Sequence, residues 1–314
     1  MFANIYPIQR LPRRFGTFTY AVPDKKASEI VRGRFVMIPW RSGIVRGVVA
    51  RVHEEETKAK SVIDVLPTRM TDGELCVYER VAEETFQSVS SVLDAAFPNP
   101  RKRSSRNTPS LLSSSRNSLQ TNLTTSPHIP VSELERLENV AKNPPPHAFV
   151  ETGDLIEAAL LVRFLSKHRS DPILFLVPHE HDLNIAAELF SLWSLAPRVC
   201  TSELTEPQRH DLAEAWRRGE IPLLLSTRLG SLFLPPQHLA GIVVGRSGVD
   251  EHAQYDRNPR YDARRLTLAW SRIRSCPLLL CDTLARCVDL NMIAATDIKK
   301  PLFEIISLAD RVRF

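Results

Sequence analysis

The feature that most constrains the fold is the alternation of short apolar runs with amphipathic stretches after residue 131. The apolar runs are HAFVE, ILFLVP, PLLLS, GIVVG and PLLLC, and helical periodicity occupies residues 154–168, 183–193, 207–219 and 261–275 between them. Continuous apolar strands that alternate with helices are typical of a parallel sheet covered on both faces. The pattern therefore predicts an α/β unit over residues 131–314, with FEIISL near its end as a candidate for one more strand.

The first third of the chain has a different pattern. Residues 2–66 contain five short runs rich in β-branched and aromatic residues, FANIYPI, GTFTYAVP, RFVMIPW, GIVRGVVARV and SVIDVLP. Such runs at close spacing predict a small, barrel-like β-sheet. Helical spacing over residues 72–97 predicts helices that cap this sheet, so that the N-terminal domain covers residues 1–98.

Between the two units the composition changes abruptly. Residues 99–130 are dominated by Ser, Thr, Asn, Pro and Arg, and no acidic residue occurs from 101 to 130. Too few apolar side chains remain to offset the entropy of ordering such a segment. We therefore predict a disordered linker over residues 99–130.

Charge and cysteine content narrow the function classes. The net charge is +5, and residues 10–51 hold ten Lys or Arg against two acids, which favours a polyanionic partner, although a solvated surface accounts for the charge equally well. No apolar run approaches the roughly 18 residues of a membrane span, so no membrane partner is expected. The five cysteines include no C-x-x-C pair, so neither zinc nor a disulfide framework is expected and the reducing cytoplasm is the predicted location.

Two groups of motifs occur in order along the chain. The first is LPRRFGTFTYAVP, VRGRFVMIPW, GIVRGVVARV and KSVIDVL, and the second is STRLGSLF, GIVVG, PRYDARRL and PLLLCDT. The first group resembles the 3′ DNA-binding domain of primosomal protein N′, the family of PriA-type replication-restart helicases. The second resembles the first helicase lobe of that family. The resemblance implies a DNA-binding domain over 1–98 and a RecA-like, P-loop NTPase-like lobe over 131–314.

The resemblance also implies a pocket for the free 3′ end of a DNA strand. The family's aromatic residue falls on Phe18, the neighbouring acid on Thr19, a glycine on Arg41 and a lysine on Lys60. An aromatic ring at Phe18 would stack on a base, and the cations would hold phosphates. The change of the acid to Thr19 removes a carboxylate that would bind the terminal sugar hydroxyl. The candidate DNA-binding residues are Phe18, Thr19, Arg41, Lys60, Arg13 and Arg14.

The nucleotide motif of the family is incomplete. An active P-loop requires Gly-x-x-x-x-Gly-Lys-Ser/Thr, whereas FVETGDLIEAALLVRFL stands at this place and the chain has no Gly-Lys dipeptide. Thr152 and Gly153 remain as a vestigial nucleotide site at most. The lysine position falls near Leu155 and Ile156, which we expect to pack into the lobe. We therefore expect neither ATP with Mg²⁺ as a cofactor nor a catalytic residue.

The metal-binding acids are missing as well. RSG at 246–248 follows GIVVG, and the DEH at 250–252 lies too far beyond the strand, where loop surface is the preferred interpretation. The H-x-H at 179–181 lacks a third ligand, and Asp182 is interpreted as a helix N-cap. No second helicase lobe, zinc insertion or winged helix is recognisable, so the chain resembles a shortened, degenerate relative.

Three hypotheses follow for the function. The first is a DNA-binding protein of replication restart that recognises 3′-ended or forked DNA without hydrolysing ATP. The alternatives are an ATP-dependent DNA helicase or translocase of superfamily 2, and a protein-interaction scaffold of the replisome. DNA is the expected partner under the first hypothesis, and other replisome proteins are further candidates.

Overall fold

The N-terminal unit is a closed antiparallel sheet. The computed structural model describes residues 1–55, 58–100, 129–287 and 304–306. The strands are β1 (Phe2–Pro7), β2 (Phe18–Ala21), β3 (Arg34–Trp40), β4 (Gly43–His53) and β5 (Asp64–Arg69), in the order β2-β1-β4-β3-β5. Residues 60–63 close it, because the Ala21 amide donates to the Lys60 carbonyl (2.9 Å) and the Ile63 amide to the Met37 carbonyl (2.9 Å). The predicted barrel-like sheet is confirmed.

The barrel encloses a small core of its own. Strand β1 alternates between half-buried and buried positions, as expected where one face is turned inward. A Cβ on Gly47 of β4 would lie 2.5 Å from a methyl group of Ile5 in β1, so glycine permits the two strands to pack this closely. A short 3₁₀ turn at Asp24–Lys26 follows β2.

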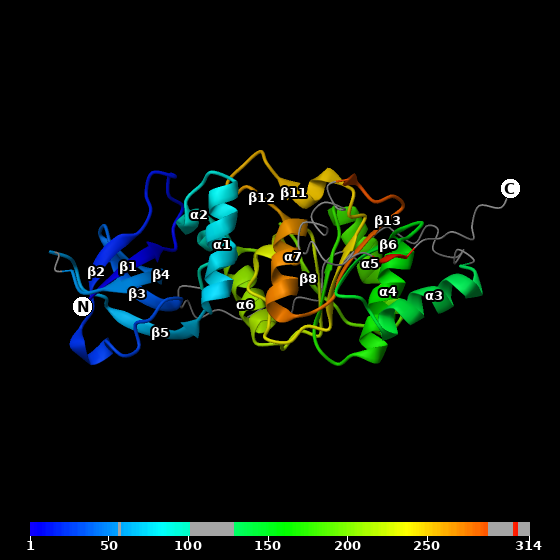
Figure 1. The fold of residues 1–314 in the computed structure, drawn as a ribbon, viewed down its shortest axis with the longest axis horizontal. Coiled ribbons are helices and arrows are strands. Elements are labelled where there is room, and N and C mark those ends of the chain that lie inside the picture. The colour runs from blue at the N-terminus through cyan, green and yellow to red at the C-terminus, as the bar shows by residue number, and fades with distance from the viewer. Residues whose placement is uncertain (56–57, 101–128, 288–303, 307–314) are drawn as a thin grey trace.

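Two helices lie between the barrel and the second unit (Figure 1). These are α1 (Asp72–Glu84), which begins with a capping box of Thr71 and Glu74, and α2 (Val89–Ala96). The ring of Tyr78 on α1 contacts the rings of Phe97 and Trp270, with centroids 5.7 and 5.5 Å away. The helices that we predicted to cap the barrel thus also pack against the second unit, and one hydrophobic cluster extends through both.

The second unit is built on a seven-stranded sheet whose strands are all parallel. Its order is β14-β6-β13-β10-β7-β9-β8. The strands are β6 (His147–Glu151), β7 (Ile173–Leu176), β8 (Arg198–Cys200), β9 (Leu223–Ser226), β10 (Gly241–Gly245), β13 (Leu278–Asp282) and β14 (Glu304–Ile306). The predicted parallel α/β unit is confirmed, and β14 lies within the candidate strand FEIISL.

Helices cover both faces of this sheet. Helices α3 (Val131–Lys142), α4 (Leu155–His168) and α5 (Glu180–Leu192) pack on one face, and α6 (Glu206–Arg217) and α7 (Ala263–Arg274) pack with α1 on the other. Two 3₁₀ turns, η2 (Arg228–Leu232) and η3 (Asp250–His252), and a small hairpin of β11 (Ala253–Gln254) and β12 (Tyr261–Asp262) complete the unit.

Three further predictions concern what lies between and around the units. The predicted linker covers residues 99–130, of which 101–128 are outside the described residues, so the boundaries 98 and 131 stay predictions. Among the described residues no helix is long and apolar enough to cross a membrane. In the same part of the chain, no group of three His, Cys, Asp or Glu side chains could hold a metal ion, and the five cysteines are unpaired.

Candidate nucleic-acid interface

Three aromatic rings gather at one end of the barrel. Phe18 begins β2, and its ring lies edge-on against Trp40 at the end of β3, with centroids 4.7 Å apart. The ring of Phe15, in the loop before β2, stacks on Phe18 at 6.1 Å and is 37% exposed. Phe18 itself is half-buried against the barrel core, so it serves both as core residue and as part of the surface. We call Phe15, Phe18 and Trp40 the aromatic platform.

Arginines border the aromatic platform. Arg41 directly follows Trp40 in the turn between β3 and β4 and is exposed. Its φ of 51° is in the left-handed region, which glycine adopts without steric cost. This agrees with the glycine that the sequence comparison aligned with Arg41. The guanidinium of Arg14 lies 5.0 Å from the ring centre of Phe15, and that of Arg13 lies 4.7 Å from Phe86 in the turn between α1 and α2.

The other two sequence-predicted positions lie apart from the platform. Strand alternation turns Phe18 toward the interior and Thr19 toward the outer face, where the Thr19 hydroxyl donates to the side-chain oxygen of Asn4 (3.0 Å). Lys60 is exposed beside Ala21, at the opposite end of β2 from Phe18. The structure therefore places Phe18 beside Trp40, the residue before Arg41, whereas the side chain of Thr19 lies on the other face of β2 and Lys60 at its other end. The roles of all six residues stay predictions.

The loop between β6 and α4 is the segment that we compared with a P-loop in the sequence. The N-terminus of a helix normally attracts anions through its free amides. Here Asp154 accepts hydrogen bonds from the amides of Ile156 (2.9 Å) and Glu157 (3.0 Å), while Glu157 accepts one from the amide of Gly153 (2.6 Å). Leu155 is buried, as expected. The chain's own carboxylates thus occupy the donors that a phosphate would need.

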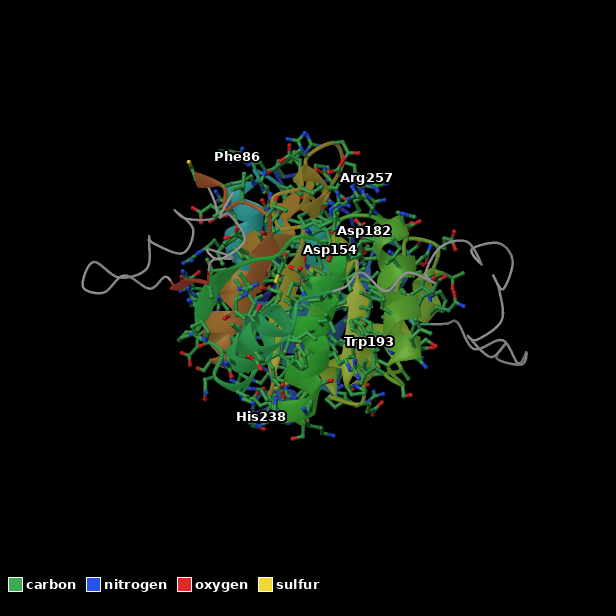
Figure 2. The ribbon with its side chains drawn as sticks, turned by 90° about the vertical axis from the view of Figure 1, so that its right-hand side faces the viewer. Phe86, Asp154, Asp182, Trp193, His238 and Arg257 are labelled. Carbon is green, nitrogen blue, oxygen red and sulfur yellow. The ribbon has the colours of Figure 1, made fainter. Side chains whose placement is uncertain are left out.

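An ion pair lies at the end of β10, where the resemblance predicted that metal-binding acids are missing. Arg246 donates to both carboxylate oxygens of Asp182, at 3.0 and 3.1 Å, and Asp182 is buried. The interpretation of Asp182 as an N-cap is wrong, because α5 begins two residues earlier at Glu180, with His179 in the cap position. Figure 2 shows Asp154 and Asp182 at the same end of the sheet.

The segment 250–252 is only partly the predicted loop surface. Asp250 and Glu251 are exposed, but His252 is fully buried, and its Nε2 donates to the carbonyl of Gly245 at 3.0 Å. Burial lowers the pKa of His252 to about 4, so that the ring is neutral at physiological pH. The sequence offers no periodicity in this loop from which its burial could be read.

Two of the four arginines in the segment 261–275 have structural contacts. Arg264 is buried, pairs with Asp262 at 2.7 Å and donates to the carbonyl of Ser247 at 2.8 Å. Arg274 forms a buried ion pair with Glu74 of α1 and donates to the carbonyls of Pro235 and Pro236. Both guanidinium groups are thus engaged by groups of the protein itself.

The comparison with known proteins bears on the barrel and the helices that follow it. Residues 9–98 match the family model described as the 3′ DNA-binding domain (3′BD) of PriA. The matched range contains the aromatic platform, its bordering arginines and both α1 and α2. No curated protein matches the chain.

Proposed function

We propose that this chain is a DNA-binding protein of replication restart, because residues 9–98 match the family model of the PriA-type 3′ DNA-binding domain. It recognises 3′-ended or branched DNA in the cytoplasm and hydrolyses no ATP. The observation that carries the proposal is the aromatic platform, because an accessible ring bordered by Arg14 and Arg41 suits an unpaired base with its phosphates. Other replisome proteins are candidate partners.

The platform supplies sequence-independent affinity. Stacking of one base on an aromatic side chain contributes roughly 1–3 kcal/mol, whichever base it is. Arginine contacts to phosphates release counterions, so the affinity falls as salt rises. Thr19 is engaged with Asn4 on the outer face, so we expect little preference for a 3′ hydroxyl over a blocked 3′ terminus.

The α/β unit supports the absence of ATP hydrolysis. Phosphoryl transfer depends on an amide cradle, a lysine and a metal-held carboxylate that meet at the β- and γ-phosphates. In this chain the amides at the start of α4 donate to the carboxylates of Asp154 and Glu157. The ion pair of Arg246 and Asp182 lies at the end of β10, where an active relative would hold its metal ion. A nucleotide would have to displace two carboxylates and would gain no metal ligand in return.

The experiment is a titration of fluorescent DNA followed by anisotropy. Forked DNA with a free 3′ end, the same fork with a blocked 3′ end and a blunt duplex are compared at several salt concentrations. Phe18→Ala should weaken binding of the forks by roughly 1–3 kcal/mol, and Lys60→Ala should lower the salt slope by about one contact. The control Phe2→Ala removes a half-buried ring from the outer face of the same barrel, where it stacks on His53.

Two outcomes would contradict the proposal. Folded Phe18→Ala protein that binds as tightly as the wild type at every salt concentration would favour the scaffold hypothesis. Equal affinity for forks and blunt duplex would leave only non-specific attraction by the basic surface.

A further inference from the structure

A cavity of about 520 Å³ opens where the loop over residues 8–17 meets the carboxyl ends of β7, β8 and β9. Its lining includes four arginines that come from four separate segments, Arg10, Arg209, Arg228 and Arg257. The acids in its lining are Glu180 and Glu251. The cavity, which we call the arginine pocket, therefore has an excess of positive charge.

Not all four guanidinium groups are engaged to the same extent. Arg228 donates to the carbonyl of Glu251 (3.1 Å) and to Gln254 (3.4 Å), and Arg10 donates to the carbonyl of Asn258 (3.2 Å). Arg257 is exposed on the rim. The Nε of Arg209 is buried without a hydrogen-bond partner among the described residues. Arg209 also lines the adjoining hollow with Asp94 and Glu206, so a phosphate in the pocket would share this guanidinium with those carboxylates.

A continuous strip of arginines and aromatic rings joins the aromatic platform to this pocket. Arg14 lies on Phe15 of the platform, and the next arginine along the loop, Arg13, lies on Phe86. Phe86 is 68% exposed, so its ring is accessible to a base as well as to Arg13.

The strip is held against the second unit next to Phe86. Gln87 donates to the carbonyl of Arg260 (2.6 Å) and accepts from its amide (3.1 Å), so the turn between α1 and α2 is fixed to the loop that carries Arg257. Figure 2 shows Phe86 and Arg257 on the same side of the molecule. The contacts thus form one surface across both units.

We propose that a single DNA strand runs from the aromatic platform over Arg13 and Phe86 into the arginine pocket, which holds its backbone phosphates. The proposal rests on the proposed function, because the strand starts at the platform. Exposed rings stack only on unpaired bases, which favours a single strand over a duplex. The pocket would then be a second DNA site, made jointly by the barrel loop and the α/β unit.

The test uses the full chain and single-stranded oligothymidylates of two lengths. A strand of about 6 nucleotides is within the range that one small barrel covers, and one of about 20 extends beyond it. A longer strand offers more positions at which one site can bind it, and this alone raises the affinity. We expect the wild type to bind the long strand more tightly than this statistical gain explains. Arg209→Ala and Arg257→Ala should each weaken the long strand about tenfold and leave the short strand unchanged, and Phe86→Ala should act in the same direction.

A matched control separates the pocket from general charge. Arg198→Ala removes an exposed arginine at the start of β8, the end of the strand opposite the pocket, and should leave both affinities unchanged. The salt slope for the long strand should fall by about 0.7 in each pocket variant, the value for one contact to a single strand.

The outcomes distinguish this inference from the proposed function. A wild type that fails to bind the short strand would refute DNA binding at the platform. Binding of the short strand with no gain for the long one, or pocket variants that bind the long strand like Arg198→Ala, would overturn the inference alone. Release of the long strand by inorganic phosphate at matched ionic strength, with no effect on the short strand, would support the assignment of the pocket to backbone phosphates.

Discussion

Tyr78 is the side chain whose removal should best test whether the two units unfold as one. It is completely buried on α1, contacts the rings of Phe97 and Trp270, and donates its hydroxyl to the carbonyl of Leu232 at 3.0 Å. Tyr78→Phe leaves that buried carbonyl without its donor, at a cost of about 1–3 kcal/mol. Tyr78→Ala also opens a cavity and should cost about 3–5 kcal/mol.

Unfolding by heat and by guanidinium, followed by far-UV circular dichroism and by tryptophan fluorescence, measures this effect. Because the cluster around Tyr78 extends through both units, we expect one cooperative transition that moves as a whole. The Ala variant should lower Tm on the order of 10 °C. Tyr255→Ala removes a tyrosine that is 65% exposed and should change stability by less than about 0.5 kcal/mol. Two separate transitions, of which Tyr78→Ala moves only one, would refute the shared core.

Two further predictions concern His252 and nucleotide hydrolysis. The folded pKa of His252 is about 4 against an ordinary 6.5, so the unfolded chain binds the extra proton first, and stability should fall by about 3 kcal/mol as the pH drops from 6.5 to 4. Burial also lowers the pKa of His147, so His252→Gln should remove only part of this loss of stability at low pH. The control His238→Gln changes an exposed side chain and should leave the loss as it is. An unchanged pH profile of stability in His252→Gln would contradict the low pKa of His252. Phosphate release from Mg²⁺-ATP with forked DNA should stay at background, whereas turnover that Gly153→Pro abolishes would favour the helicase.

The layered fold could be predicted because burial on both faces leaves a direct trace in the sequence. Strands such as GIVVG and PLLLC are continuously apolar, and no other common environment requires this at such a length. The position of α1 could not be predicted in the same way. Its apolar stripe shows that one face is buried but not against which partner, and Trp270 lies 192 positions further along the chain than Tyr78.

The ion pairs of the α/β unit could not be predicted either, because their partners are far apart in the sequence. Asp182 and Arg246, like Glu74 and Arg274, are ion pairs between segments far apart in the chain, and neither residue of a pair carries a local signal for the other. The arginine pocket draws on four such segments. Phe18 could be named as a candidate from the motif that resembles the family. Its neighbours in the platform, Phe15 and Trp40, were found only in the structure.

The start of α4 and the arginine pocket are two places where an anion could bind, and they differ in the charges already present. At the start of α4, Asp154 and Glu157 satisfy three amides, and each would repel a phosphate about 4 Å away by about 4 kcal/mol per unit charge near a protein surface. In the arginine pocket the excess charge is positive, and a buried Nε of Arg209 lacks a partner within the described residues. Of these two places, the arginine pocket is therefore the more favourable for an anion, and the barrel loop helps to build it through Arg10. Under our proposal the α/β unit holds the strand that the barrel binds, and the affinity of the protein for DNA should not respond to ATP.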